Sequence, residues 1–333
     1  GAKRATRTHS CRKPSHRAPD QSFPAKLGQA LMRSAALHLA SWQALPLPEC
    51  SLAESPRYAH GRWMWLDINN HVLYRLNQTD PFQPEAGNLY TLNLPDEIGC
   101  VLPTPNSHTL VALGRQGGWR IEDNTCTLKL PAPFDQTRHR FNDGRADHTG
   151  RIWISTLVDA RSPATAALYC IESGLSHLKI PDLIVGNGLA FSPKGDAAFL
   201  SDTRHKCIWR FDFDVHNGEL SNQCVIKHYS DGTARPDGAC FSADGSYWVA
   251  VLEGYRLDRF SSQGEFMESI EVPLAKPTMP CFGGENGNIL LVTSAKADDK
   301  FPNKPGFENI SLIACNTEFR GMPEALANPA HLG

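Results

Sequence analysis

A strand of one type recurs six times along this chain at nearly constant spacing. Each copy follows a turn residue, in five cases a glycine, and holds four mainly apolar residues, as in M-W-L-D from residue 64 and I-W-I-S from residue 152. The copies begin at residues 64, 109, 152, 198, 247 and 290, which makes the successive spacings 45, 43, 46, 49 and 43 residues. Repetition at this period, with few helix-like segments after residue 45, indicates a radial array of β-sheet units.

One unit can be read in full because its turns are well marked. Residues 238–243, 246–252, 255–261 and 265–272 read as four short strands, with turns at A-D-G and S-Q-G whose glycines accommodate positive φ. Six such units predict an all-β fold, a six-bladed β-propeller with four antiparallel strands per blade, which closes into a ring and protects its sheet edges. We expect residues 37–44 to close the last blade beside residues 310–315. The rival fold, a parallel β-helix, has far shorter coils.

The composition supports a packed globular protein. The 333 residues are 41% hydrophobic and 20% charged, the balance of a chain with a core. The net charge of -2 and the pI near 6.7 give no electrostatic reason to expect nucleic acid or a membrane as partner. No apolar run approaches the roughly 20 residues of a spanning helix. We therefore expect a soluble monomer or weak homodimer.

Ten cysteines are scattered along the chain, and no two form a C-x-x-C pair. They fall mostly inside apolar runs, as small buried hydrophobic residues do in a reducing compartment. We therefore expect a cytoplasmic protein without a disulfide framework or a cysteine zinc site.

The amino-terminal segment differs from the rest in composition. Its first 19 residues include six lysines or arginines and no acid. This pattern is typical of a basic leader, a solvated tail or an added segment. We therefore expect residues 1–35 to lie outside the fold and to contribute little to stability, and residues 36–333 to form a single propeller domain.

Four oxygen-bearing side chains occur at the same phase of four repeat units. Asn142, Asn187 and Asp237 each stand eight residues before a turn glycine, and Glu54 stands seven residues before one. In a propeller this phase lies where the innermost strand begins, so side chains remote in sequence converge at one mouth of the central channel. Any one of them alone would read as an ordinary turn former. Four in register favour a shared site.

A shared cation would explain such a cluster, because buried carboxylates and amides without partners are destabilising. Glu54, Asn187 and Asp237 offer only oxygen, and no histidine or cysteine shares their phase. Oxygen ligands favour calcium, magnesium or manganese, while zinc and ferrous iron remain open alternatives. The alternative is an ion in the channel that has a purely structural role and takes no part in catalysis.

Several segments resemble the regucalcin/gluconolactonase family, also called the senescence marker protein family. They are L-A-E-S-P, R-F-N-D-G-R-A-D-H-T-G-R-I-W-I-S-T, N-G-L-A-F-S-P-K-G-D-A-A-F-L-S-D, P-D-G-A-C-F-S-A-D-G-S-Y-W-V-A-V and P-T-M-P-C-F-G-G-E-N-G-N-I-L-L-V-T-S-A. The resemblance implies a six-bladed propeller with one divalent metal ion at the channel mouth. It also implies hydrolysis of a sugar lactone, such as a gluconolactone, to the aldonic acid in carbohydrate oxidation.

The resemblance also suggests roles for single residues. Glu54, Asn187 and Asp237 match the family's metal ligands, although L-A-E-S-P replaces the usual G-E-G-P. Arg140 and Asn142 match residues that contact the hydroxyl groups of the substrate. Where relatives known to us carry an acidic pair, this chain has Asp159 followed by alanine, which leaves the preferred sugar open.

Hydrolysis of a cyclic ester needs an activated water and a stabilised oxyanion, which a divalent ion can support. Asp237 is the candidate general base, and Arg140 can donate paired hydrogen bonds to hydroxyls or developing charge. No G-x-S-x-G elbow is present, which argues against a serine hydrolase. Two alternatives remain: a related hydrolase of aromatic lactones or phosphotriesters, and a non-catalytic calcium-binding propeller. His139 is expected to pack or line the rim rather than bind metal.

Overall fold

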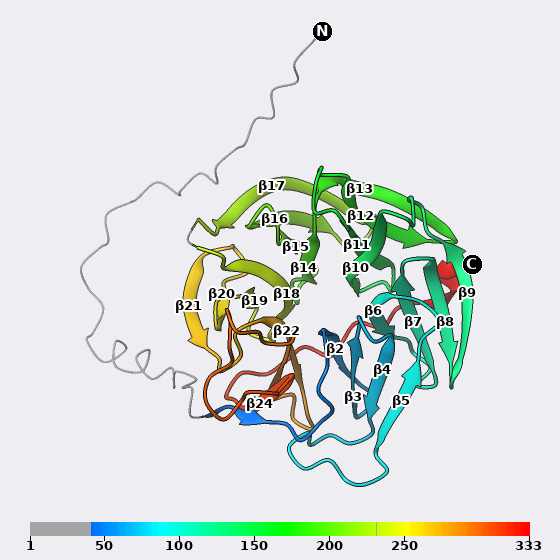
Figure 1. The fold of residues 1–333 in the computed structure, drawn as a ribbon. Coiled ribbons are helices and arrows are strands. Elements are labelled where there is room, and N and C mark those ends of the chain that lie inside the picture. Colours follow the sequence, from blue (N-terminus) through cyan, green and yellow to red (C-terminus); the bar gives the residue numbers. More distant parts are fainter. Residues whose placement is uncertain (1–40, 231) are drawn as a thin grey trace, which may run out of the picture.

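Six antiparallel sheets of four strands are arranged around a central axis (Figure 1). The computed structural model describes residues 41–230 and 232–333. The only helices in the described chain are short 3-10 turns, such as η2 (Pro329–Leu332). No helix in this described part is long and apolar enough to cross a membrane. The predicted six-bladed propeller is confirmed.

Five blades are continuous in sequence, and in each the strands follow one another outward from the axis (Figure 1). Blade 1 holds β2 (Ala53–Ala59), β3 (Arg62–Asp67), β4 (Val72–Leu76) and β5 (Leu89–Asn93). Blade 2 holds β6 (Ile98–Pro103), β7 (Thr109–Gly114), β8 (Gly117–Glu122) and β9 (Thr125–Pro131). Blade 3 holds β10 (His139–Ala146), β11 (Ile152–Val158), β12 (Ala166–Glu172) and β13 (Leu175–Leu183). Blade 4 holds β14 (Gly186–Phe191), β15 (Ala197–Asp202), β16 (Cys207–Asp214) and β17 (Glu219–His228). Blade 5 holds β18 (Arg235–Phe241), β19 (Tyr247–Leu252), β20 (Arg256–Phe260) and β21 (Phe266–Glu271).

The sixth blade joins the two ends of the described chain. It holds β22 (Pro277–Gly283), β23 (Ile289–Ser294) and β24 (Leu312–Asn316), and its outermost strand is β1 (Gln43–Ala44). The closing register pairs Gln43 with Ala314 and Ala44 with Ile313. This closure was predicted, although residues 37–40 of the expected strand lie outside the described residues. The boundary between residues 35 and 36 lies there too and stays a prediction.

The second strand of each blade is the repeated strand of the sequence. These strands begin at residues 62, 109, 152, 197, 247 and 289, within two residues of the expected starts. Their tryptophans fill the space between blades: Trp65, Trp153 and Trp248 are each at most 1% exposed. Trp153, for example, packs edge-on against Phe191 of the next blade. Tight packing of this kind holds the blades in a rigid ring.

The inner strands begin earlier than predicted. The fifth was expected to start at residue 238, but β18 already pairs with β19 from Arg235. The expected start was wrong because a β-bulge interrupts the ladder between Pro236 and Ala239, and the polar cluster there resembles a turn in the sequence. The four polar residues therefore lie within the inner strands, in their mouth-side halves, and not at their first residues.

Candidate active site at the channel mouth

The same irregularity occurs in every inner strand that carries a predicted site residue. Each of these strands breaks its register with the second strand at residues 54/57, 141/144, 187/190 and 236/239. A bulge leaves residues unpaired and turns their side chains away from the regular alternation. The bulges lie near the channel mouth, which we define as the end where the inner strands begin.

Glycines beside the bulges allow the inner strands to pack closely against neighbouring strands. Gly188 has φ +60°, and a Cβ there would lie 2.6 Å from the hydroxyl of Tyr247. A Cβ on Gly144 would lie 2.4 Å from the carbonyl oxygen of Trp153. Both distances are too short for a side chain, so these positions need glycine.

Asn142 connects two neighbouring blades. Its Nδ2 donates to Oδ1 of Asn187 (3.0 Å) and to the carbonyl oxygen of Gly186 (2.8 Å). Its Oδ1 accepts a hydrogen bond from Nη1 of Arg140 (2.7 Å). The structure thus brings Arg140, Asn142 and Asn187 into one hydrogen-bonded chain, and this chain fixes the orientation of both amides.

Asn187 is also tied to the fifth blade. Its Nδ2 donates to the hydroxyl of Thr203 (2.8 Å), which donates to the carbonyl oxygen of Pro236 (2.8 Å). Asp237 follows directly in the chain, so the position of one predicted ligand is coupled to that of the next. Thr203 belongs to no motif in the sequence, and only the folded ring reveals its role.

Arg140 is buried and is held by a carboxylate that sequence reasoning missed. Its Nε lies 2.8 Å from Oε1 of Glu97, just before the inner strand of blade 2. Glu97 also accepts hydrogen bonds from Arg115, which in turn binds Asp159 (2.8 Å). Nothing near Glu97 in the sequence suggests a site. Its position is set by the ring closure of neighbouring blades.

Two carboxylates face the channel without a neutralising partner of their own. The pKa of Glu54 is raised to about 7, chiefly by burial and then by the negative charge of Asp143. The pKa of Asp237 is also raised well above its usual range, first by burial and then by the charge of Glu54. Among described residues, no side chain donates a hydrogen bond to either carboxylate; Glu54 accepts one from the backbone N–H of Ser55 (2.9 Å). Glu54 and Asp237, from blades 1 and 5, therefore lie within electrostatic reach across the channel.

The donor set at this mouth fits a hard cation. The two carboxylates would gain a shared counter-charge, and Oδ1 of Asn187 keeps a lone pair beyond the bond from Asn142. The described residues contain no group of three or more His, Cys, Asp or Glu placed to hold an ion. A cation at this point would therefore depend on amide oxygen as well as on the two acids.

Comparisons with known proteins identify relatives of this chain. Residues 52–296 match the family described as the SMP-30/Gluconolactonase/LRE-like region. The chain belongs to this family. A 6-deoxy-6-sulfogluconolactonase of Pseudomonas putida is 34% identical over 236 residues, which cover 70% of this chain and 78% of the relative. The regucalcin of Oryctolagus cuniculus is 27% identical over 75% of this chain and 85% of its own length.

Solved structures of the SMP-30/gluconolactonase type share the fold. A calcium-binding regucalcin from Agrobacterium tumefaciens superimposes with a TM-score of 0.77 at 23% identity, covering 86% of this chain and 96% of the other. A gluconolactonase from Xanthomonas campestris gives a TM-score of 0.64 at 19% identity, covering 85% and 92%. At such identities the likeness concerns the propeller itself.

His139 packs at the rim of this family member's channel, as expected. It is 7% exposed, and its Nε2 lies 2.9 Å from the hydroxyl of Thr165. Its Nδ1 faces the carbonyl oxygen of Asp135 (3.3 Å). Both ring nitrogens thus have partners away from the acidic pair.

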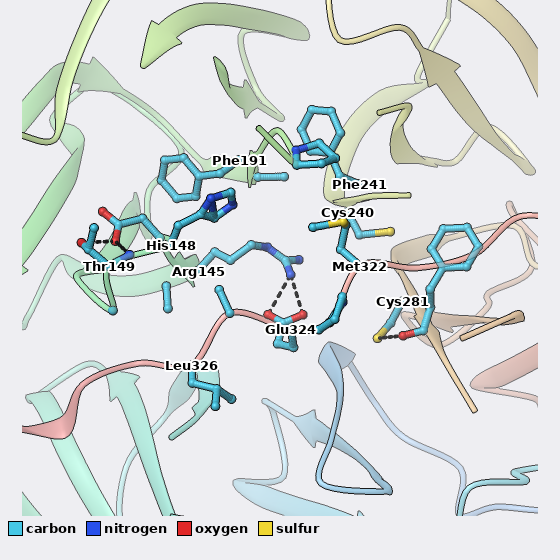
Figure 2. A pocket seen from close by; sticks show the side chains of 18 of the residues that line it. Arg145, His148, Thr149, Phe191, Cys240, Phe241, Cys281, Met322, Glu324 and Leu326 are labelled. Atoms are coloured by element: carbon cyan, nitrogen blue, oxygen red, sulfur yellow. Dashed lines mark hydrogen bonds and ion pairs between the residues drawn. The ribbon is translucent and has the colours of Figure 1, made fainter. Parts of the chain in front are cut away.

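A cavity of about 770 Å³ lies at the opposite end of the channel, which we call the far end (Figure 2). The carboxy-terminal segment lines it, and Glu324 points at Arg145 from this segment with both oxygens 2.8 Å from Nη1. The second acid of the lining, Asp147, is paired with Arg151 (2.7 Å). Because both acids are neutralised and aromatic and sulfur-bearing side chains make up much of the rest, this cavity lacks the donor set of the mouth. We therefore take the mouth as the candidate active site.

Proposed function

We propose that this protein hydrolyses a sugar lactone to the aldonic acid at the channel mouth, with one divalent metal ion bound there. The feature that carries the proposal is the pair Glu54 and Asp237, two acids at one mouth that form no ion pair with a described residue, together with the buried Arg140. Family membership supports it, as does a 34% identical relative named as a sulfogluconolactonase. The protein is thus a hydrolase of the lactonase class.

Glu54, Asn187 and Asp237 would hold the ion, and their oxygens favour calcium, magnesium or manganese over softer metals. Zinc and ferrous iron stay within the proposal until they are tested. The bound ion would supply Lewis-acid polarisation and a more acidic water. Asn142 would position Asn187 through the hydrogen bond between their amides, as outer partners of metal ligands do.

The remaining chemistry comes from the chain itself. Asp237 takes a proton from water on a carboxylate oxygen, as a general base does. The resulting hydroxide adds to the lactone carbonyl, and the ring C–O bond breaks as the ring oxygen takes the proton that Asp237 accepted. Arg140 donates hydrogen bonds to substrate oxygens, and Glu97 holds its guanidinium in one orientation.

The location proposed for this chemistry is the cytoplasm. Buried cysteines, including Cys50, Cys100 and Cys281, form no disulfide. Burial also raises the pKa of the Cys100 thiol to about 11, so this group is an inert core residue. Such thiols are typical of a reducing compartment.

The test is a panel of lactones assayed on metal-stripped protein with single ions restored. We expect loss of hydrolysis on chelation and recovery with one or a few divalent ions. The variant Asp237→Asn removes the proposed base and should lose hydrolysis. Its matched control is Asp123→Asn, because Asp123 is exposed and its φ of 52° suits asparagine. Hydrolysis that is unaffected by chelation would refute the metal, and ion binding without hydrolysis of any lactone would favour the non-catalytic alternative.

A further inference from the structure

Two arginines sit on neighbouring loops at the mouth and take no part in the site described above. The second strand of each blade ends at the mouth, so the loop that follows it lies on the rim. In blade 3 this loop carries Arg161, whose N–H donates to the carbonyl oxygen of Val158 (2.9 Å). In blade 4 it carries Arg204, whose N–H donates to Oδ1 of Asp202 (2.9 Å).

Both arginines lie close to the acids and amides of the mouth. Arg204 follows Thr203 directly, and the hydroxyl of Thr203 accepts the hydrogen bond from Asn187 (2.8 Å). Burial lowers the pKa of Arg161, and the positive charge of Arg204 lowers it further, while Asp237 is among the acids that raise it. The guanidinium group of Arg161 is therefore within electrostatic reach of both Arg204 and Asp237.

Three other arginines of this rim are neutralised. Arg140 and Arg115 share Glu97, and Arg235 binds Glu253 through two hydrogen bonds of 2.7 and 2.8 Å. By contrast, Arg161 and Arg204 form no ion pair with any described residue. The one hydrogen bond from the Arg161 guanidinium goes to the carbonyl oxygen of Val158 (3.3 Å).

Two adjacent positive charges that form no ion pair are a recognition feature for an oxyanion. The guanidinium group is planar, stays charged and matches the spacing of sulfonate, phosphate or carboxylate oxygens. The neighbouring acid Asp159 forms its ion pair with Arg115 and not with Arg161, and the next residue is Ala160. The mouth therefore combines an acidic centre, suited to a cation, with a basic edge over blades 3 and 4.

We propose that Arg161 and Arg204 form an anion subsite, so that the preferred substrate is a sugar lactone with a negatively charged group remote from the lactone carbonyl. This inference rests on the proposed lactonase function and names its substrate class. A sulfonate, a phosphate ester and a carboxylate share the required chemistry. The subsite acts in substrate binding, so we expect its loss to change KM more than kcat.

The test compares lactones that share a ring but differ at carbon 6, on the metal-loaded full chain. The neutral member is gluconolactone, and the charged members carry a 6-sulfonate, a 6-phosphate or a 6-carboxylate. We expect the wild-type protein to prefer at least one charged lactone. Arg161→Gln and Arg204→Gln should each lower the charged-to-neutral ratio of kcat/KM by about tenfold, the scale of one charge-assisted hydrogen bond at a partly exposed site.

The control is Lys296→Gln, which removes a positive charge from the same mouth in blade 6. Lys296 is 63% exposed and pairs with Glu49, so its removal should barely change the ratio. A second measurement needs no variant: added salt should raise KM for the charged lactone much more than for the neutral one, because exposed charges are screened.

The outcomes separate the subsite from the proposed function. If gluconolactone is hydrolysed and the double variant Arg161→Gln/Arg204→Gln keeps the wild-type ratio, the subsite is wrong and the lactonase proposal stands. If the wild-type protein hydrolyses no lactone, charged or neutral, both are overturned. The charged lactone with the largest loss in the variants identifies the anion.

Discussion

The two ends of the channel differ in whether their acidic side chains form ion pairs. At the far end, one largely buried acid, Glu324, faces two arginines: Oε1 lies 3.3 Å from Nε of Arg57, and both oxygens lie 2.8 Å from Arg145. At the mouth, burial and the charge of Asp143 raise the pKa of Glu54, burial and the charge of Glu54 raise that of Asp237, and neither acid forms an ion pair with a described residue. Acid is compensated at one end and left uncompensated at the other.

This difference separates stability from function in one ring. A compensated buried charge holds segments together and has no capacity left for a ligand. At the far end, the ion pairs of Glu324 attach the carboxy-terminal segment to the inner strands of blades 1 and 3. Arg57 links the same two blades, since it also donates to the carbonyl oxygen of Gly144 (2.7 Å). Acids without an ion pair destabilise the metal-free protein, so binding of a cation or a proton at the mouth is favourable.

The largest expected effect is at the far end. Glu324→Ala leaves Arg57, which is fully buried, and Arg145 without their acid. We expect a loss of about 3–5 kcal/mol in the free energy of unfolding, as for other broken buried pairs, measured by denaturant titration. Glu324→Gln keeps acceptor oxygen and should lose less. A loss in Glu324→Ala no greater than that of a surface substitution would show that the far end is not held by this pair.

The next largest expected effect is a loss of catalytic rate at the mouth. Asp237→Asn keeps the shape and one oxygen but removes a charge and the proposed base. We expect normal folding, weaker metal binding and a loss of at least about a hundredfold in kcat, the scale of general-base catalysis. Without metal, the variant should be no less stable than the wild type, because a repulsion is removed. Near-normal turnover at saturating metal would mean that the role of Asp237 is misassigned.

Much of the fold could be predicted because its signals are local. A turn glycine and a four-residue apolar strand repeat in each blade, and both depend on neighbouring residues alone. The phase of Asn187 and Asp237 followed from the same repeat. The resemblance of motifs then suggested roles that the composition alone would not.

What could not be predicted depends on contacts between blades. Glu97 binds Arg140, and Glu324 binds Arg57, across long stretches of chain, and neither acid has a motif. The bulges were also missed, because an asparagine or aspartate beside glycine reads as a turn when its strand partners are unknown. Long-range pairing decides these features.

A smaller effect tests the raised pKa of Glu54. In metal-free protein, the folded pKa of about 7 exceeds the ordinary value of 4.5, so the folded state holds its proton over that window while the unfolded state releases it. Stability from this group is complete below pH 4.5 and is lost as the pH rises through 7. Relative to Glu54→Gln, which does not titrate, the wild type should lose on the order of 3 kcal/mol between pH 4.5 and 8. A difference that does not change with pH would contradict the raised pKa.

The smallest effect separates substrate binding from metal binding at the mouth. The guanidinium of Arg140 reaches Glu97 through Nε and Asn142 through Nη1 at once, and the single ammonium of Arg140→Lys can replace only one of these contacts. We expect KM for the lactone to rise by about tenfold, the scale of one lost charge-assisted hydrogen bond. Metal affinity, measured by titration of the stripped protein, should change much less, because charge is retained and Asn187 keeps its bond to Thr203. Equal losses in both measurements would place Arg140 in the support of the metal site instead of at the substrate.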